Sequence, residues 1–517
     1  MRRIAALATA VAGLMACRAF TAPAQAATPS AQVSCQSLAD VPLPDTIVVA
    51  VQEVTSGSFN DSGAAPGGGN SMSGLPAFCR YAGIVKPKIN FEVWLPLQNW
   101  NGRLQGGGNG GLAGSLSYSD LAKAVKTGFV GVATDTGHSG SDNAWLTDQQ
   151  QLADYGYRAI HEMTVRAKAL AKVLYGQGPQ YSYFDGCSTG GGQALMSAQR
   201  YPEDYDGILA GASNWNQTRL RAGGHIWAWS ALHATPDSAL SRAQFTLVTN
   251  AAIEKCDAAD GVKDGVIDDP AACKFDAAAL ACKAGQSGDE CLNPAQVAAV
   301  NRIYAGSRNP RTGEAIWPAY VPGSESGWSV FTGATPFGAA SAFFQYAVFR
   351  DPSFDFTKFD FDKDVAKAET GYAAILDATN PDLRAFRDHG GKLIIYHGYA
   401  DPMITPLASI QYYRSVVDFF GRQAKSKSAL SDVQQFARLF MLPGVGHCGG
   451  GAGPDQFDGM QALQDWVERR QAPARIVAAH VSGGKTDRTR PLCAWPAKAV
   501  YKGTGDSNDA ANFECKS

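Results

Sequence analysis

Gly186-Cys187-Ser188-Thr189-Gly190 is the stretch of sequence that decides the fold of this chain. A short apolar run, Tyr181 to Phe184, leads into it, and a helical stretch of small residues, Gly191 to Gln199, follows it. This is the pattern G-x-S-x-G between a strand and a helix, a sharp turn that presents a serine hydroxyl above a sheet. A side chain at either glycine would crowd the strand or the helix. The pattern alone is common in a chain with 56 glycines, so its meaning depends on its context.

The segments around this motif alternate between expected strands and helices. Phe129 to Thr134 is a short apolar run, typical of a buried strand in a parallel sheet. From Tyr155 to Tyr175 the apolar residues recur at helical spacing, and Gly176 ends the helix. Another strand is expected over Tyr205 to Ala210. This alternation predicts an α/β sheet.

The alternation is interrupted between about Ala212 and Asp388. This region contains cysteines, many aromatic residues and long irregular pieces, which fit a domain inserted on top of the sheet. We therefore expect a core built from residues 27–211 and 389–517, with an inserted domain over residues 212–388.

The strand–helix pattern resumes after the inserted domain. Strands are expected over Lys392 to Tyr396 and over Ala437 to Leu442, with a helix between them around Ile410 to Phe420. A helix near Gly459 to Arg469 and a strand over Arg475 to Val481 are expected to close the core.

Length and charge limit the classes of function. A chain of 517 residues, of which 45% are apolar, is long enough for a large core and one or two domains. A formal net charge of −2 gives no electrostatic reason to expect nucleic acid or an anionic membrane as a partner, and it favours a small or neutral substrate. After the N-terminal segment, no stretch is apolar enough to span a bilayer.

The N-terminal segment predicts export. Arg2-Arg3 precede an apolar run from Ile4 to Ala16, and Ala24-Gln25-Ala26 supplies a cleavage site, so we interpret residues 1–26 as a secretory signal peptide. Leu14-Met15-Ala16-Cys17 offers an alternative, a bacterial lipoprotein signal, although Met is unusual in it. We expect a secreted or periplasmic protein.

The cysteine count supports export. Eleven cysteines without Cys17 leave ten, an even number in a chain that leaves the cytosol. Their layout indicates four local pairs, Cys35 with Cys79, Cys256 with Cys273, Cys282 with Cys291, and Cys493 with Cys515. Cys187 and Cys448 remain, either as free buried thiols or as a fifth pair far apart in the sequence.

A serine hydroxyl is a poor nucleophile without a base, and one of the eight histidines is well placed to serve Ser188. His447 lies in a glycine-flanked loop, Pro443 to Cys448, directly after an expected strand. Asp401 follows the preceding expected strand and supplies the acid that orients the imidazole. The order Ser188, Asp401, His447 is the order expected of α/β-hydrolases.

The remaining two cysteines fit this constellation. Cys187 is adjacent to the candidate nucleophile, and Cys448 is adjacent to the candidate base. If Ser188 and His447 meet, a disulfide between their neighbours would fasten the two loops and preorganise the pair.

These motifs resemble those of the tannase and feruloyl esterase family, which also contains terephthalate-monoester hydrolases. Cys187-Ser188, Asp401 and His447-Cys448 match the family's "CS-D-HC" motif. The similarity covers nearly all the mature chain and includes three further segments, Thr134-Asp135-Thr136-Gly137-His138, Tyr201-Pro202 through Ala212, and Arg490-Pro491-Leu492-Cys493. The resemblance implies an α/β-hydrolase core, a large inserted lid and a disulfide that joins the catalytic loops.

Acyl transfer also needs two donors for the tetrahedral oxyanion. The backbone N–H of Thr189, directly after the nucleophile, is the usual first donor. The second is expected from the glycine run Gly106 to Gly111, and the resemblance points to Gly111. The alternative interpretation of this run is a merely flexible turn.

An acidic loop, Asp257 to Val266, places three carboxylates within ten residues and contains glycines that turn the backbone. Closely spaced oxygen ligands favour calcium, although the intervals differ from those of an EF-hand. The resemblance implies a structural Ca²⁺ bound by the side chains of Asp257, Asp260 and Asp264 and by the carbonyls of Val262 and Val266. A disulfide between the flanking Cys256 and Cys273 would hold the ends of the loop together. The alternative interpretation of the loop is a solvated acidic turn.

Two histidines and the lid aromatics complete the candidates. We interpret His138 and His397 as structural hydrogen-bonding residues rather than second bases. The late lid is rich in aromatic residues, most of them expected in the core and a few against an aromatic acyl group. They are Trp317, Tyr320, Trp328, Phe331, Phe337, Phe343, Phe344 and Tyr346.

The charge pattern of the late lid bears on the substrate. No Lys or Arg occurs between Thr312 and Phe349, whereas a substrate with a free carboxylate would require a cation in its pocket. This favours a neutral phenolic acid, unless Arg311 or Arg350 folds inward.

We therefore expect a secreted serine esterase that cleaves esters of aromatic, hydroxycinnamic acids through an acyl-enzyme. The alternatives within this class are a tannase acting on galloyl esters and an aryl-diester or terephthalate-monoester hydrolase. A non-catalytic carbohydrate- or phenolic-binding protein on an inactivated hydrolase scaffold is the alternative from another class, and the intact triad argues against it. The sequence gives neither the alcohol part of the ester nor the oligomeric state.

Overall fold

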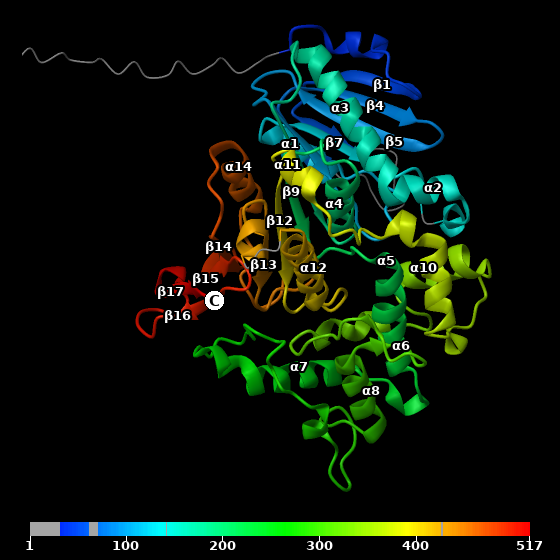
Figure 1. Cartoon of the computed structure of the whole chain (residues 1–517), viewed down its shortest axis with the longest axis vertical. Coiled ribbons are helices and arrows are strands. Elements are labelled where there is room, and N and C mark those ends of the chain that lie inside the picture. The colour runs from blue at the N-terminus through cyan, green and yellow to red at the C-terminus, as the bar shows by residue number, and fades with distance from the viewer. Residues whose placement is uncertain (1–30, 61–70, 141, 425–427) are drawn as a thin grey trace, which may run out of the picture.

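The computed structural model describes residues 31–60, 71–140, 142–424 and 428–517. The predicted signal peptide (residues 1–26) and the lipoprotein alternative at Cys17 lie outside the described residues. Figure 1 shows the sheet with its covering helices in the upper part of the view and the green helices of the lid in the lower part.

A nine-stranded mixed sheet forms the core, in the spatial order β1-β4-β5-β7-β6-β8-β9-β12-β13. The strands are β1 (Thr46–Val54), β4 (Phe78–Val85), β5 (Ile89–Pro96), β6 (Arg103–Gly107), β7 (Val130–Thr134), β8 (Tyr181–Cys187), β9 (Gly207–Gly211), β12 (Lys392–Gly398) and β13 (Ala437–Leu442). From β7 to β13 all neighbours are parallel. The N-terminal strands β1, β4 and β5 join antiparallel at the other end. The α/β fold expected from the sequence is confirmed.

Helices cover both faces of this sheet. They are α1 (Tyr118–Lys126), α3 (Ala159–Tyr175), α4 (Thr189–Arg200), α12 (Pro406–Ala424) and α14 (Gly459–Arg469), with the short α2 (Gln149–Ala153) and α13 (Ala429–Val433) at its margins. Successive strand residues point to opposite faces. In β9, Ile208 and Ala210 pack in the cluster that includes α3, α4 and α12, whereas Leu209 packs in the cluster that includes α14. Both faces of the central strands are therefore buried, as their continuous apolar runs predict.

The lid contributes no strand to the nine-stranded sheet among its described residues. It contains α5 (Gln217–Arg219), the π-helix η4 (Leu220–Ile226), α6 (Trp227–Leu232), α7 (Arg242–Cys256), α8 (Pro294–Ala305), α9 (Gly338–Ala342), α10 (Lys363–Leu376) and α11 (Arg384–Asp388), with strands β10 (Ser307–Arg308) and β11 (Ala315–Trp317). Most of its aromatic residues are buried, and one cluster joins Phe343 and Phe344 of the lid to Trp145 and Tyr155 of the core. The lid is thus packed directly on the core.

The strand expected over Arg475 to Val481 is present as β14 (Arg475–Ser482), and its Ile476 and Ala478 pack in the core cluster that includes α14, but it does not join the nine-stranded sheet. β14 pairs with β15 (Lys485–Cys493) as a hairpin outside the main sheet, and its Ala479 forms one isolated bridge to Gln456. Gly483 and Gly484 both have positive φ, so they form the two-residue turn that favours a hairpin. The remaining strands also form small pairs, β2 (Ser58–Asn60) with β3 (Ser71–Ser73) and β16 (Lys498–Tyr501) with β17 (Phe513–Lys516).

Five disulfides join the pairs that the sequence indicates, including Cys187 with Cys448 across a sequence separation of 261 residues. The other four are Cys35–Cys79, Cys256–Cys273, Cys282–Cys291 and Cys493–Cys515. In the described ranges no helix is both long and apolar enough to cross a membrane.

Glycines allow β8 to turn sharply into α4. A Cβ atom placed on Gly186 would lie 2.6 Å from the carbonyl carbon and oxygen of Gly190. A Cβ atom placed on Gly108, at the end of the neighbouring β6, would lie 2.6 Å from the Cα of Gly190. Three backbone segments therefore meet without side chains between them, which is the reason for the glycines in G-x-S-x-G.

We predict that Gly186→Ala destabilises the protein by about 1–3 kcal/mol, because the methyl group cannot be accommodated without moving the backbone. Thermal denaturation followed by circular dichroism measures the effect. Gly178→Ala is the matched control, since no atom lies within 4 Å of its added Cβ. A Gly186→Ala variant that melts at the temperature of the wild type would contradict this account of the turn.

Candidate active site

Ser188 occupies the turn between β8 and α4 in a conformation that side-chain-bearing residues rarely adopt, with φ 63° and ψ −119°. Backbone hydrogen bonds hold it there: its N–H donates to Gly211 O (3.0 Å), and its carbonyl accepts from Gly192 N (3.1 Å) and Asn214 N (3.1 Å). Such strain persists only when the surroundings fix it, and it is characteristic of a nucleophile elbow.

His447 and Asp401 meet as the sequence predicts. Asp401 follows β12, His447 follows β13, and the His447 Nδ1 lies 2.7 Å from the Asp401 Oδ2. The Asp401 side chain is fully buried, whereas that of His447 is 18% exposed. The carboxylate thus fixes the ring so that Nε2 remains available.

A second histidine supports the same carboxylate. The His397 Nε2 lies 3.1 Å from the Asp401 Oδ2 and 2.9 Å from the Ile404 carbonyl, while its Nδ1 bonds the Ser409 hydroxyl (2.7 Å). The other carboxylate oxygen of Asp401 accepts the N–H groups of Met403 (2.8 Å) and Ile404 (3.0 Å). His397 is therefore the structural hydrogen-bonding residue expected from the sequence, but its contact with Asp401 was not foreseen.

Asp401 and His447 each shift the pKa of the other in the direction that favours its charged form. Burial raises the pKa of Asp401, but the hydrogen bonds from His397 and His447 outweigh it and hold the pKa below its usual value. Burial lowers the pKa of His447, but the hydrogen bond and charge of Asp401 outweigh it and raise the pKa above 6.5. His447 is consequently a stronger base than a free imidazole.

One pocket of about 410 Å³ brings the sequence-predicted residues together. Ser188, Thr189, Gly111 and His447 all line it. The Cys187–Cys448 disulfide, with a Cα–Cα distance of 5.9 Å, joins the nucleophile and base loops at its wall. Among the described residues no hydrogen bond links the Ser188 hydroxyl to His447, and such bonds commonly tighten only when substrate binds.

Side chains of α4 hold the glycine loop that is expected to supply the second oxyanion donor. The Thr189 hydroxyl donates to the Gly111 carbonyl (2.6 Å). The Gln193 amide bonds both the backbone N–H (2.9 Å) and the side chain (3.0 Å) of Asn109, and Gly190 N donates to Asn109 O (2.7 Å). The loop is therefore fixed rather than merely flexible, and Gly111 has the positive φ (56°) that favours glycine.

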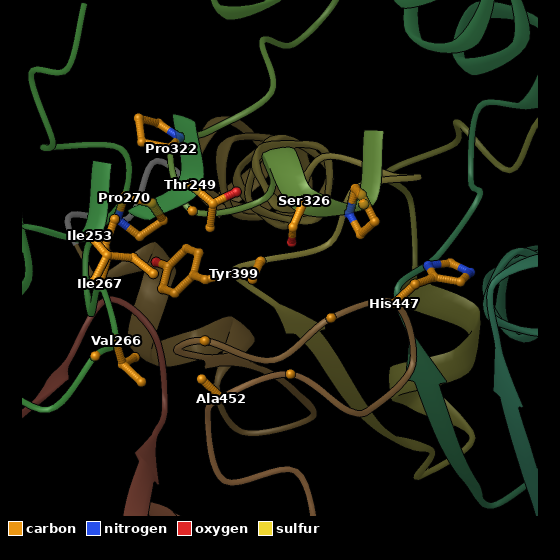
Figure 2. A pocket seen from close by; sticks show the side chains of 18 residues that line it. Thr249, Ile253, Val266, Ile267, Pro270, Pro322, Ser326, Tyr399, His447 and Ala452 are labelled. Carbon is orange, nitrogen blue, oxygen red and sulfur yellow. The ribbon is translucent and has the colours of Figure 1, made fainter. Parts of the chain in front are cut away.

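A second cavity of about 280 Å³ lies on the other side of the His447 loop, between the lid and the core (Figure 2). Its walls carry apolar side chains such as Val266, Ile267 and Pro322. Figure 2 shows the His447 ring pointing away from the other labelled side chains, and Ser188 is not among the residues that line this cavity. The cavity therefore contacts the base loop and His447 but not the nucleophile Ser188.

The acidic loop is folded on itself and tied to the core. Both carboxylate oxygens of Asp257 accept backbone N–H groups, from Asp264 (3.0 Å) and Gly265 (2.9 Å). Asp264 forms an ion pair with Arg490 of β15. Asp268, two residues after the loop, is a further carboxyl that hydrogen-bonds Asp260, and burial together with the charge of Asp260 raises its pKa.

Across the described ranges, no three His, Cys, Asp or Glu side chains are arranged as a metal cage. The three carboxylates of the ligand set implied by the resemblance, those of Asp257, Asp260 and Asp264, are therefore not gathered as such a cage in this structure. The donor chemistry of the loop, oxygen atoms only with clustered negative charge, fits a hard cation such as Ca²⁺.

The remaining candidates are mostly structural. His138 stacks on Trp145 with ring centroids 3.9 Å apart, and burial lowers its pKa to about 4. Of the eight aromatic residues proposed for the late lid, Phe337 is the one that lines the Ser188 pocket. Arg311 and Arg350 are exposed and do not enter it. The pocket nevertheless contains a cation, Arg221 of η4, which precedes the cation-free stretch between Thr312 and Phe349 in the sequence.

The comparisons with known proteins agree with this geometry. The family described as "Tannase and feruloyl esterase" matches residues 76–516. An uncharacterized esterase from Xanthomonas campestris is 37% identical over 541 residues, covering 94% of this chain and 92% of that protein. Feruloyl esterase B from Aspergillus niger is 33% identical, covering 82% and 83%. The crystal structure of feruloyl esterase B from Aspergillus oryzae superposes with a TM-score of 0.85 at 32% identity, covering 93% of this chain and 99% of that one.

Proposed function

The chain belongs to the tannase and feruloyl esterase family and is a carboxylesterase, and from that premise we propose that it hydrolyses esters of hydroxycinnamic acids through Ser188, His447 and Asp401. The observation that carries this proposal is the single pocket lined by Ser188 and by His447, whose Nδ1 lies 2.7 Å from the Asp401 carboxylate. Feruloyl esterases among the relatives support the choice of acyl group.

In the first half of the proposed reaction, Ser188 Oγ attacks the ester carbonyl carbon while His447 Nε2 accepts the hydroxyl proton. The backbone N–H groups of Thr189 and Gly111 stabilise the negative oxygen of the tetrahedral intermediate. His447 then returns the proton to the leaving alcohol, and the acyl group remains bound to Ser188.

In the second half, water attacks the acyl-enzyme and His447 accepts its proton. The tetrahedral intermediate collapses, the same proton returns to Ser188 Oγ, and the free acid leaves. Asp401 keeps the tautomer of His447 fixed and stabilises the imidazolium, while His397 and two backbone N–H groups keep Asp401 in place.

We further propose that the protein is exported and binds calcium. Five disulfides are typical of proteins that leave the cytosol, and they fit the signal peptide expected from the sequence. Asp257, Asp260 and Asp264, with the carbonyls of Val262 and Val266, are the residues that would hold Ca²⁺. The ion would neutralise the acidic loop and hold the lid together, without a direct part in ester cleavage.

We predict that kcat/KM for methyl ferulate exceeds kcat/KM for methyl gallate and for a terephthalate monoester by at least about 10-fold. We also predict that Ser188→Ala lowers kcat/KM for methyl ferulate at least about 10⁴-fold. Steady-state hydrolysis of the three esters measures both effects. Ser197→Ala is the control, because this buried serine of α4 does not line the pocket and should retain activity. A preference for the gallate would contradict the acyl group proposed, and unchanged turnover in Ser188→Ala would remove Ser188 from the reaction.

We predict a pH profile of kcat/KM whose acid limb has its midpoint above pH 6.5, because the base must be neutral and Asp401 raises the pKa of His447. Asp401→Asn should lower kcat/KM by about 10³–10⁴-fold. Asp377→Asn is the control, since burial raises the pKa of Asp377 to about 6 and this carboxyl would otherwise be a rival source of the limb. A limb at or below pH 6.5, or one that moves in Asp377→Asn, would count against His447.

We predict that removal of Ca²⁺ lowers the melting temperature by at least about 3 °C, because a ligand that binds only the folded state stabilises it. Elemental analysis of the purified protein and melting with and without a chelator make the measurement. Asp260→Asn should remove the effect of the chelator, whereas Asp289→Asn, an exposed lid residue outside the loop, should keep it. Protein shown to be free of metal that melts at an unchanged temperature would refute the site.

A further inference from the structure

Buried polar atoms without a partner gather in the Ser188 pocket. In the described part of the chain, seven buried side-chain nitrogen or oxygen atoms have no hydrogen-bond partner. Three of the seven belong to residues that line this pocket: Asn214, Arg221 and His225. Each of these residues is more than nine-tenths buried, with exposures of 8%, 2% and 4%. Because unpaired buried polar groups are costly, their concentration in one pocket points to a ligand that pairs with them.

Arg221 supplies a hydrogen-bond donor. Its Nη2 bonds the Gln217 side chain (2.7 Å) and the Tyr155 hydroxyl (3.3 Å), and its guanidinium lies 4.7 Å from the centre of the Phe343 ring. Its Nη1 has no partner, and among the described residues no carboxylate oxygen lies within 4.0 Å of the guanidinium nitrogens. The N–H groups of Nη1 are therefore left for a ligand.

His225 supplies an acceptor. Its Nε2 lies 3.1 Å from the Met403 carbonyl, and because a carbonyl only accepts, Nε2 carries the hydrogen. The Nδ1 atom is then an unprotonated acceptor without a partner. Burial lowers the pKa of His225 to about 3, so the ring remains neutral at the pH at which an esterase works.

Asn214 supplies a second acceptor. The Thr189 hydroxyl donates to Gly111 O, so its oxygen can only accept, and the Asn214 amide turns its nitrogen toward it at 3.4 Å. The Asn214 Oδ1 has no partner. The pocket thus offers one unpaired donor and two unpaired acceptors.

These unpaired donors and acceptors indicate which polar group the acyl part of the substrate carries. A carboxylate only accepts, so it would pair with Arg221 and leave the acceptors of His225 and Asn214 unpaired. A phenolic hydroxyl both donates and accepts, so it pairs with Arg221 and with one of the two acceptors. Apolar residues of the same pocket, Leu220, Phe337 and Ile404, provide surface for an aromatic ring.

Resting on the proposed function, we propose that Arg221 and His225 determine specificity by binding the phenolic hydroxyl of the acyl group. The hydroxyl donates to His225 Nδ1 and accepts from Arg221 Nη1. The two residues are four positions apart in η4 (Leu220–Ile226), a spacing that makes them neighbours on one helix face. A site built to bond a hydroxyl rejects the analogue that lacks it, because its own buried groups then stay unpaired.

Methyl p-coumarate and methyl cinnamate test this assignment, since they differ only in the phenolic hydroxyl. We expect the wild type to favour methyl p-coumarate by at least about 100-fold in kcat/KM. Arg221→Met removes the donor, and His225→Phe removes the acceptor while an aromatic ring still packs against Phe337. Each variant should reduce the preference at least 10-fold. A loss of folding or of general activity would lower both esters alike and leave the ratio unchanged.

Arg302→Met is the matched control, because this lid arginine stacks on Trp227 and does not line the pocket, so the ratio should stay at its wild-type value. Equal turnover of the two esters by the wild type, or an unchanged ratio in both pocket variants, would overturn this assignment and leave the proposed function in place. Hydrolysis of monomethyl terephthalate in preference to both esters, lost in Arg221→Met, would instead overturn the proposed function and assign Arg221 to a carboxylate.

Discussion

The disulfide between Cys187 and Cys448 is the constraint on which the rest of the site depends. It joins two loops that are 261 residues apart in sequence. Because Ser188 directly follows one cysteine and His447 directly precedes the other, the bond limits how far the nucleophile and the base can separate. A cross-link over so long a loop also restricts the unfolded chain, although the size of that effect depends on the description of the unfolded state. Its local consequence is preorganisation of the proposed pair.

The parallel sheet also brings the three proposed catalytic side chains together. Ser188, Asp401 and His447 follow β8, β12 and β13, which run parallel, so their carboxyl ends lie at one edge of the sheet. The turn at Ser188 is strained and is held by backbone hydrogen bonds to Gly211 and Gly192. Asp401 is held from four directions, by two histidines and two N–H groups. Backbone hydrogen bonds and the disulfide therefore fix the loops that carry these side chains at the ends of the parallel strands.

The parts of the site that the sequence predicts are those in which neighbouring residues carry the information. Cys187-Ser188 and His447-Cys448 are adjacent pairs, and the order Ser188, Asp401, His447 follows the order of the strands. The hydrogen bond from His397 to Asp401 depends on the direction of the two side chains at the end of β12. The periodicity of the sequence does not indicate that direction. Arg221 lies in a π-helix of the lid, where the residue pattern gives no sign of which face meets the pocket. The hairpin of β14 and β15 was missed although Gly483-Gly484 marks its turn.

Covalent labelling with diethyl p-nitrophenyl phosphate tests the central claim most directly, because the reagent forms a bond with a serine only where a base removes the hydroxyl proton. Mass spectrometry of the digested protein locates the adduct, and the release of p-nitrophenol gives its rate. The account predicts one adduct, on Ser188, formed at least about 100-fold more slowly in His447→Ala. An adduct on another serine, or labelling of Ser188 at an equal rate in His447→Ala, would contradict it.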